Sequence, residues 1–71
     1  MSSPAEEQQV LDFLEKSPKL AFSPAEICRK AGHKRQFEEN PRWAIPALLH
    51  LRDQGLVDDD GFGHYRVPQD D

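Results

Sequence analysis

The chain has 71 residues, of which 37% are hydrophobic, and a formal net charge of −4 at pH 7. This length corresponds to one domain, near the lower limit at which a hydrophobic core alone stabilises a fold. So short a chain has little material for a deep substrate cleft, and it contains no Ser-His-Asp, Cys-His or glycine-rich phosphate-loop motif. We therefore expect no catalysis, no cofactor and no small-molecule substrate.

The charge is unevenly distributed. Residues 1–28 carry two basic and five acidic side chains, residues 29–66 carry seven basic and six acidic ones, and residues 67–71 add two acidic ones. Nucleic-acid-binding domains usually have a clear basic excess. Only a local patch of this chain would therefore serve such a partner.

The sequence also limits the compartment and the metal chemistry. Cys28 is the only cysteine, so a disulfide or a cysteine-based metal site within the chain is excluded, and a single thiol suits a reducing compartment. No apolar run approaches the roughly 20 residues needed to span a bilayer, and the first residues lack the basic start and apolar core of a signal peptide. We expect a cytoplasmic protein, with the nucleus as the alternative, and no membrane or metal partner.

Two helices are predicted in the first half, each from a Ser-Pro-Ala-Glu start in which serine caps and proline takes the first helical position. The first helix spans residues 4–16, and its apolar residues recur at three- and four-residue spacing. The second spans residues 24–31, with Gly32 as its left-handed terminal residue. Residues 20–22 between them are expected to be extended, as a minor strand beside the C-terminal hairpin.

A longer helix is predicted over residues 41–54, after a join of residues 33–40 that includes a further helical turn. Phe37 in this join is expected to fill the gap between the helices on either side. Pro46 removes a backbone hydrogen bond inside the helix, which predicts a kink there; the alternative is a regular helix that begins near Ile45. Gly55 ends the helix. Its buried face is predicted to contain Ala44, Ala47, Leu48 and Leu51.

A β-hairpin is predicted after Gly55. Leu56-Val57 forms the first strand, Asp60-Gly61 a tight turn and residues 62–67 the returning strand. The fold class is therefore mainly α with a small β-hairpin (α+β), in a single domain of residues 1–71. Its ordered core covers about residues 4–67, with three helices, and the tails 1–3 and 68–71 are expected to be loose.

This order of helix, connector, helix, helix and hairpin resembles the winged helix-turn-helix superfamily over residues 5–67. The most specific part is Leu48-x-x-Leu51-x-x-x-Gly55-Leu56-Val57, followed by a tight turn and Tyr65-x-Val67. The resemblance implies a transcription-regulator-like domain whose third helix enters the major groove of double-stranded DNA and whose wing contacts the backbone or the minor groove. The long join and the internal proline depart from the usual pattern of the family.

Two functions are weighed for this domain, with DNA binding as the leading hypothesis and a protein contact as its alternative. The first is DNA binding, in which Lys34 and Arg35 hold phosphates, helix 41–54 approaches a groove and the wing assists; its predicted contact residues are Lys34, Arg35, Arg42, Trp43, His50 and Arg66. The second is contact with a protein partner or a homodimer through the apolar face of Ile45, Pro46 and Leu49. Structural roles compete with both functions, because a single tryptophan is often part of the core and cations are favoured at a helix C-terminus. The three carboxylates Asp58 to Asp60 would repel phosphates, and a solvated turn is favoured there over a calcium site.

Overall fold

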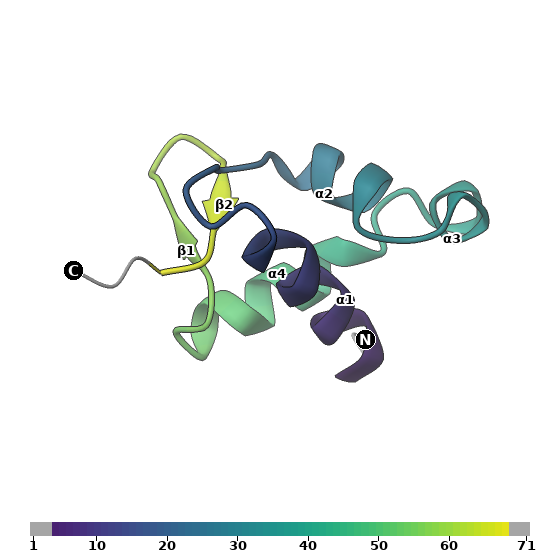
Figure 1. Cartoon of the computed structure of the whole chain (residues 1–71). Coiled ribbons are helices and arrows are strands. Elements are labelled where there is room, and N and C mark those ends of the chain that lie inside the picture. Colours follow the sequence, from purple (N-terminus) through teal and green to yellow (C-terminus); the bar gives the residue numbers. More distant parts are fainter. Residues whose placement is uncertain (1–3, 69–71) are drawn as a thin grey trace.

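A computed structural model describes residues 4–68 of the chain. Within them, four helices precede a two-stranded antiparallel hairpin: α1 Pro4–Glu15, α2 Pro24–Lys30, α3 Lys34–Glu39, α4 Ala44–Asp53, β1 Asp58–Asp59 and β2 Tyr65–Arg66. Figure 1 shows α1 and α4 at the centre, α3 at one end and the hairpin at the other. The small α+β class is confirmed, but a fourth helix joins the three that were predicted. Residues 1–3 and 69–71 of the predicted loose tails lie outside the described residues.

The predicted start of α2 is confirmed in atomic detail. The Ser23 hydroxyl accepts a hydrogen bond from the Glu26 amide at 3.2 Å, and Pro24 is the first helical residue. The corresponding cap of α1, Ser3, lies outside the described residues. Both helices end one residue earlier than predicted, at Glu15 and Lys30.

The predicted join of residues 33–40 contains α3, so the extra helical turn expected there is present. Gly32 does not have the predicted left-handed conformation, since only Gly55, Gly61 and Gly63 have positive φ among the described glycines. Its role is steric. A Cβ atom at this position would lie 2.7 Å from Cζ2 of Trp43 and would also meet the Gln36 side chain. Gly32 therefore allows the chain between α2 and α3 to pass close to the Trp43 ring.

The prediction of a kinked helix over residues 41–54 is wrong, because α4 begins only at Ala44. The backbone first makes a turn, in which Asn40 accepts hydrogen bonds from the Arg42 amide through Oδ1 (3.2 Å) and from the Trp43 amide through its carbonyl (3.1 Å). Pro46 is then the third helical residue. Amides in the first turn have no intrahelical acceptor, so a proline costs no hydrogen bond there.

The predicted end of α4 at Gly55 is confirmed. Gly55 has φ of 78°, and its amide donates to the Arg52 carbonyl at 3.0 Å. The next amide, of Leu56, donates to the Leu51 carbonyl at 2.9 Å. These two bonds form a Schellman motif, which directs the chain out of the helix and into the hairpin.

The hairpin is present, but its strands lie elsewhere than predicted. β1 begins after Val57 instead of at Leu56, and the pairs are Asp58 with Arg66 and Asp59 with Tyr65. The predicted Asp60-Gly61 turn is part of a longer loop, because the Asp60 amide donates to the His64 carbonyl at 3.0 Å. The Asp60 carboxylate holds that loop by accepting from two amides inside it.

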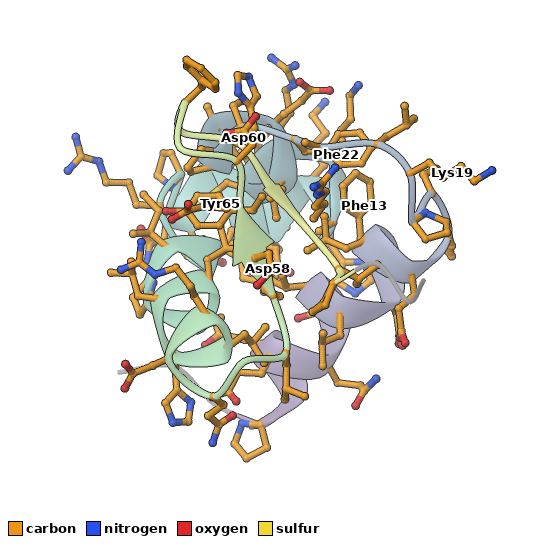
Figure 2. The ribbon with its side chains drawn as sticks, turned by 90° about the vertical axis from the view of Figure 1, so that its left-hand side faces the viewer. Phe13, Lys19, Phe22, Asp58, Asp60 and Tyr65 are labelled. Carbon is orange, nitrogen blue, oxygen red and sulfur yellow. The ribbon has the colours of Figure 1, made fainter. Side chains whose placement is uncertain are left out.

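The predicted minor strand beside the hairpin is confirmed as a single bridge. Phe22 and Tyr65 exchange two backbone hydrogen bonds of 2.9 and 2.7 Å. The Phe22 ring also packs on the Phe13 ring, with centroids 4.9 Å apart, and Figure 2 shows these two rings beside each other next to the hairpin. The Phe22–Tyr65 bridge therefore attaches the hairpin to the connector between α1 and α2, and the ring contact attaches this connector to α1.

The core lies between α1, α2 and α4. The predicted inward face of α4 is buried. Of the apolar residues that recur along α1, Val10 and Leu14 are buried, and Leu11 and Phe13 are partly buried. Val57, just before β1, is fully buried and belongs to the same core. The fully buried apolar residues among those described are Val10, Leu14, Ile27, Cys28, Trp43, Ala44, Ala47, Leu48, Leu51 and Val57.

Candidate binding surface

The six residues predicted to contact DNA fall into two groups. Lys34 and Arg35 are exposed in the first turn of α3, and Arg42 is exposed in the turn before α4. These three lie at the end of the molecule that contains α3. The other three are Trp43, which is buried in the core, His50 on α4 and Arg66 in β2.

Trp43 is a core residue. Its side chain is 3% exposed, and its indole N–H donates to the Cys28 carbonyl at 2.7 Å. Burial of the ring leaves no face for stacking on a base, so the prediction that Trp43 approaches a groove does not fit its placement. The turn at residues 41–43 rotates the indole toward α2, which helical periodicity from Pro41 does not anticipate.

His50 and Arg66 are both constrained by the fold. His50 lies on α4 with Nδ1 2.9 Å from a carboxylate oxygen of Glu7, which links α4 to the first turn of α1. Arg66 is half-buried in β2, and its Nε atom is buried without a hydrogen-bond partner. Neither belongs to the surface formed by Lys34, Arg35 and Arg42.

Salt bridges reduce the basic surface further. Arg35 pairs with Glu39 one turn along α3, at 3.0 Å, and Lys30 pairs with Glu26 on α2, at 3.1 Å. Within residues 4–68, no ion pair engages Lys34, Arg29 or Arg42. Two of these three, Arg29 and Arg42, line the same hollow.

That hollow is a groove of about 430 Å³ where α2, α3 and the start of α4 meet. Its floor is apolar because Phe37 of α3 packs against the core from outside, as its predicted place between the neighbouring helices requires. The two arginines come from different elements, Arg29 from α2 and Arg42 from the turn before α4. The lining residues are Pro24, Ala25, Cys28, Arg29, Phe37, Pro41, Arg42 and Ile45. We call this hollow the arginine groove.

The apolar face predicted for a protein partner is divided by the structure. Ile45 is half-buried and lines the arginine groove, whereas Pro46 and Leu49 are exposed on α4 and do not line it. Leu49 is 45% exposed. The three residues predicted to form one face are therefore split between the groove and the exposed side of α4.

A second hollow, of about 450 Å³, is polar. It is lined by Glu6, His33, Arg35, Gln36, Glu39, Asn40 and Trp43. At its base the side-chain amides of Gln9 and Gln36 exchange two hydrogen bonds, each 3.2 Å long, which tie α1 to α3. Its polar groups are thus largely engaged with one another. By contrast, Arg29 and Arg42 of the arginine groove have no ion-pair partner among residues 4–68.

The β1–β2 loop, residues 60–64, carries an exposed aromatic ring and follows the acidic strand β1. Asp58, Asp59 and Asp60 are solvent-exposed, but Asp58 and Asp59 lie in β1, so the turn predicted over these three aspartates begins only at Asp60. Phe62 is 85% exposed. The hydrogen bond from the Phe62 amide, together with one from His64, lowers the pKa of the Asp60 carboxyl below its ordinary value of 3.8. The loop therefore presents an ionised carboxylate next to Phe62.

Among residues 4–68, no group of three or more His, Cys, Asp or Glu side chains is arranged to hold a metal ion. In the same part of the chain, no helix combines the length and the apolar composition needed to cross a membrane.

Comparisons with protein families, with curated proteins and with solved structures found no match to this chain. The candidate surface therefore depends on the geometry alone. Sequence reasoning did not find two of its features, the arginine groove and the exposed Phe62. The sequence signal for Phe62 is an aromatic residue between two glycines directly after three aspartates, a position with no helix or sheet face to bury it. The groove has no such signal, because it requires the position of α3.

Proposed function

We propose that this chain is a winged-helix domain used as a protein-binding module, with the arginine groove as its binding site. The winged-helix assignment is supported by the order of the elements: the hairpin follows α4 directly, and Phe22 adds a third extended segment beside β2. The preferred partner is a protein segment that combines an apolar side chain with carboxylates.

The observation that carries this proposal is the composition of the groove. An apolar floor that includes Phe37 and Ile45 favours burial of an apolar side chain. Arg29 and Arg42 lack ion-pair partners among the described residues, so a carboxylate from a partner would find two available guanidinium groups. Grooves of a few hundred Å³ with a few polar groups at the rim are common ligand-binding sites.

The experiment is a titration followed by backbone amide chemical shifts. The probe is a short synthetic peptide with a central phenylalanine flanked by aspartates, and its control has lysines in place of the aspartates. We expect the acidic peptide to shift the amides of Ala25, Arg29, Phe37, Arg42 and Ile45, and the lysine peptide to leave them unchanged. Equal shifts with both peptides, or none with either, would overturn the proposal.

DNA binding is the second candidate. It is favoured by the exposed Arg29, Lys34 and Arg42, which have no ion-pair partner in the described part of the chain, and by the shared groove of the two arginines. It is opposed by the aspartates of the hairpin and by the apolar outer face of α4, because base reading favours polar side chains there. A binding assay with a DNA duplex at about 50 mM salt, where phosphate contacts are strongest, tests it. Absence of binding under that condition removes this candidate.

A further inference from the structure

The two ends of the molecule carry complementary features. The arginine groove is apolar with two basic groups at its rim, whereas the β1–β2 loop presents Phe62 beside the carboxylates of Asp58, Asp59 and Asp60. Figure 1 shows the loop and α3 at opposite ends of the molecule, whose longest dimension is 38 Å. Phe62 is 85% exposed, so the loop of one molecule does not occupy its own groove.

We propose that the arginine groove binds the β1–β2 loop of a second copy of this chain. Phe62 of one molecule enters the groove of the next, and the aspartates beside it face Arg29 and Arg42. This inference rests on the proposed function, since it names the protein partner of the same groove.

The loop is well prepared to present an aromatic side chain. The Asp60 carboxylate accepts hydrogen bonds from the Phe62 amide at 2.8 Å and from the His64 amide at 3.2 Å, and the Asp60 amide donates to the His64 carbonyl at 3.0 Å. A loop that is already held in one conformation loses little entropy on binding. Its exposed phenylalanine would bury about 150–250 Å² of surface in an apolar groove.

The charges favour one orientation of the contact. Arg52 pairs with Asp59 at 3.1 Å, and the His64 ring is 3.5 Å from Asp60. Asp58 makes no ion pair within residues 4–68. The Asp58 carboxylate on one surface and the unpaired guanidinium groups of Arg29 and Arg42 on the other supply the complementarity that orients protein contacts. The association should therefore weaken as salt is added.

The contact is head-to-tail because it joins two different surfaces. Such heterologous contacts produce rings when the rotation closes and open chains when it does not. A loop tip in a groove buries less than the roughly 1,200 Å² of a stable interface. We therefore expect weak association that increases with protein concentration.

The test is analytical ultracentrifugation between about 20 µM and about 1 mM protein, a range suited to weak complexes. The weight-average mass of the unmodified chain should rise with concentration. Phe62→Ala removes the inserted ring and Arg42→Glu reverses a charge at the groove, so each variant alone should stay monomeric. In a mixture, the intact groove of the first variant accepts the intact loop of the second, and the mass should stop at a dimer.

Lys19→Glu is the matched control for Arg42→Glu. It makes the same change of charge at an exposed position between α1 and α2, where Figure 2 shows the side chain extending away from the molecule. This variant should associate like the unmodified chain. Backbone amide spectra confirm that every variant is folded before its mass is measured.

Four outcomes would overturn the proposal: a monomeric unmodified chain at all concentrations, association that survives Phe62→Ala, a mixture that forms no dimer, or an equal loss of association in Lys19→Glu. Its failure is distinguishable from failure of the proposed function. A chain that stays monomeric but still shifts its groove amides with the aspartate-flanked peptide refutes only the second copy as partner.

Discussion

The indole N–H of Trp43 donates a hydrogen bond of 2.7 Å to the backbone carbonyl of Cys28. This bond joins the turn before α4 to the last turn of α2, where carbonyl groups lack intrahelical partners. Both side chains are buried, so no solvent competes for the carbonyl. The contact fixes α2 against α4 and thereby sets the width of the arginine groove.

Trp43→Phe should therefore destabilise the fold. The variant leaves the Cys28 carbonyl buried without its donor and opens space beside α2, which together should lower the free energy of unfolding by about 1–3 kcal/mol. Urea unfolding followed by far-ultraviolet circular dichroism measures the change. Phe62→Leu, at an exposed position, should change the stability by less than about 0.5 kcal/mol. A change of less than about 0.5 kcal/mol in Trp43→Phe would show that this hydrogen bond does not stabilise the fold.

Gly32→Ala tests the steric role of the glycine. The new methyl group would lie 2.7 Å from Cζ2 of the buried Trp43 ring and would also meet the Gln36 side chain. We expect a loss of about 1–3 kcal/mol in the free energy of unfolding, as for other overpacked positions. In a Trp43→Phe background the same substitution should cost less, because the smaller ring lacks that atom. An equal loss of stability in the two backgrounds would show that contact with the Trp43 ring is not its cause.

The Cys28 thiol should report on opening of the core. The residue is fully buried, so a thiol reagent reaches it only when α2 separates from α4. We expect labelling of the native chain to be slower than in denaturant by several orders of magnitude. Trp43→Phe should accelerate native labelling roughly 5- to 150-fold, the factor that corresponds to its predicted loss of stability. Rapid labelling of the unmodified native chain would contradict the burial of this thiol.

The β1–β2 loop should loosen in acid. Its amide donors lower the pKa of the Asp60 carboxyl, so the folded loop favours the ionised form. A group with a lowered pKa contributes its stabilisation above the pKa of the unfolded chain and loses it as the pH falls through the folded pKa. The amide shifts of Phe62 and His64 should therefore titrate with a midpoint below 3.8. A midpoint at or above that value, or an unchanged titration in Asp60→Asn, would contradict this account.

Local sequence signals predicted most of the elements. Ser23-Pro24 begins α2, Gly55 ends α4, and the spacing of Ala44, Ala47, Leu48 and Leu51 identifies the buried face. Each of these features depends on hydrogen bonds or contacts between residues close together in the chain. Such features can be predicted from sequence because they do not require the positions of other elements.

Three predictions are wrong, two because a local side-chain hydrogen bond redirects the backbone and one because of a contact between distant residues. A helix starting at Pro41 predicts that Trp43 is available to a DNA groove, but the Asn40 turn delays the helix to Ala44 and the indole is buried in the core. Gly32 was assigned to a helix end, although the constraint on it comes from a ring eleven residues later in the sequence. The Asp60-Gly61 turn became a longer loop because a carboxylate accepts amides from within it.

The class of fold, the buried faces of the helices and the acidic character of the hairpin follow from the order and spacing of residues along the chain. Which charged groups of different elements lie near one another depends on how the helices pack. Arg29 and Arg42 are separated by α3, and they line one groove because that short helix folds back and places Phe37 between α2 and α4. The spacing of residues along the chain does not reveal that these two arginines line the same groove.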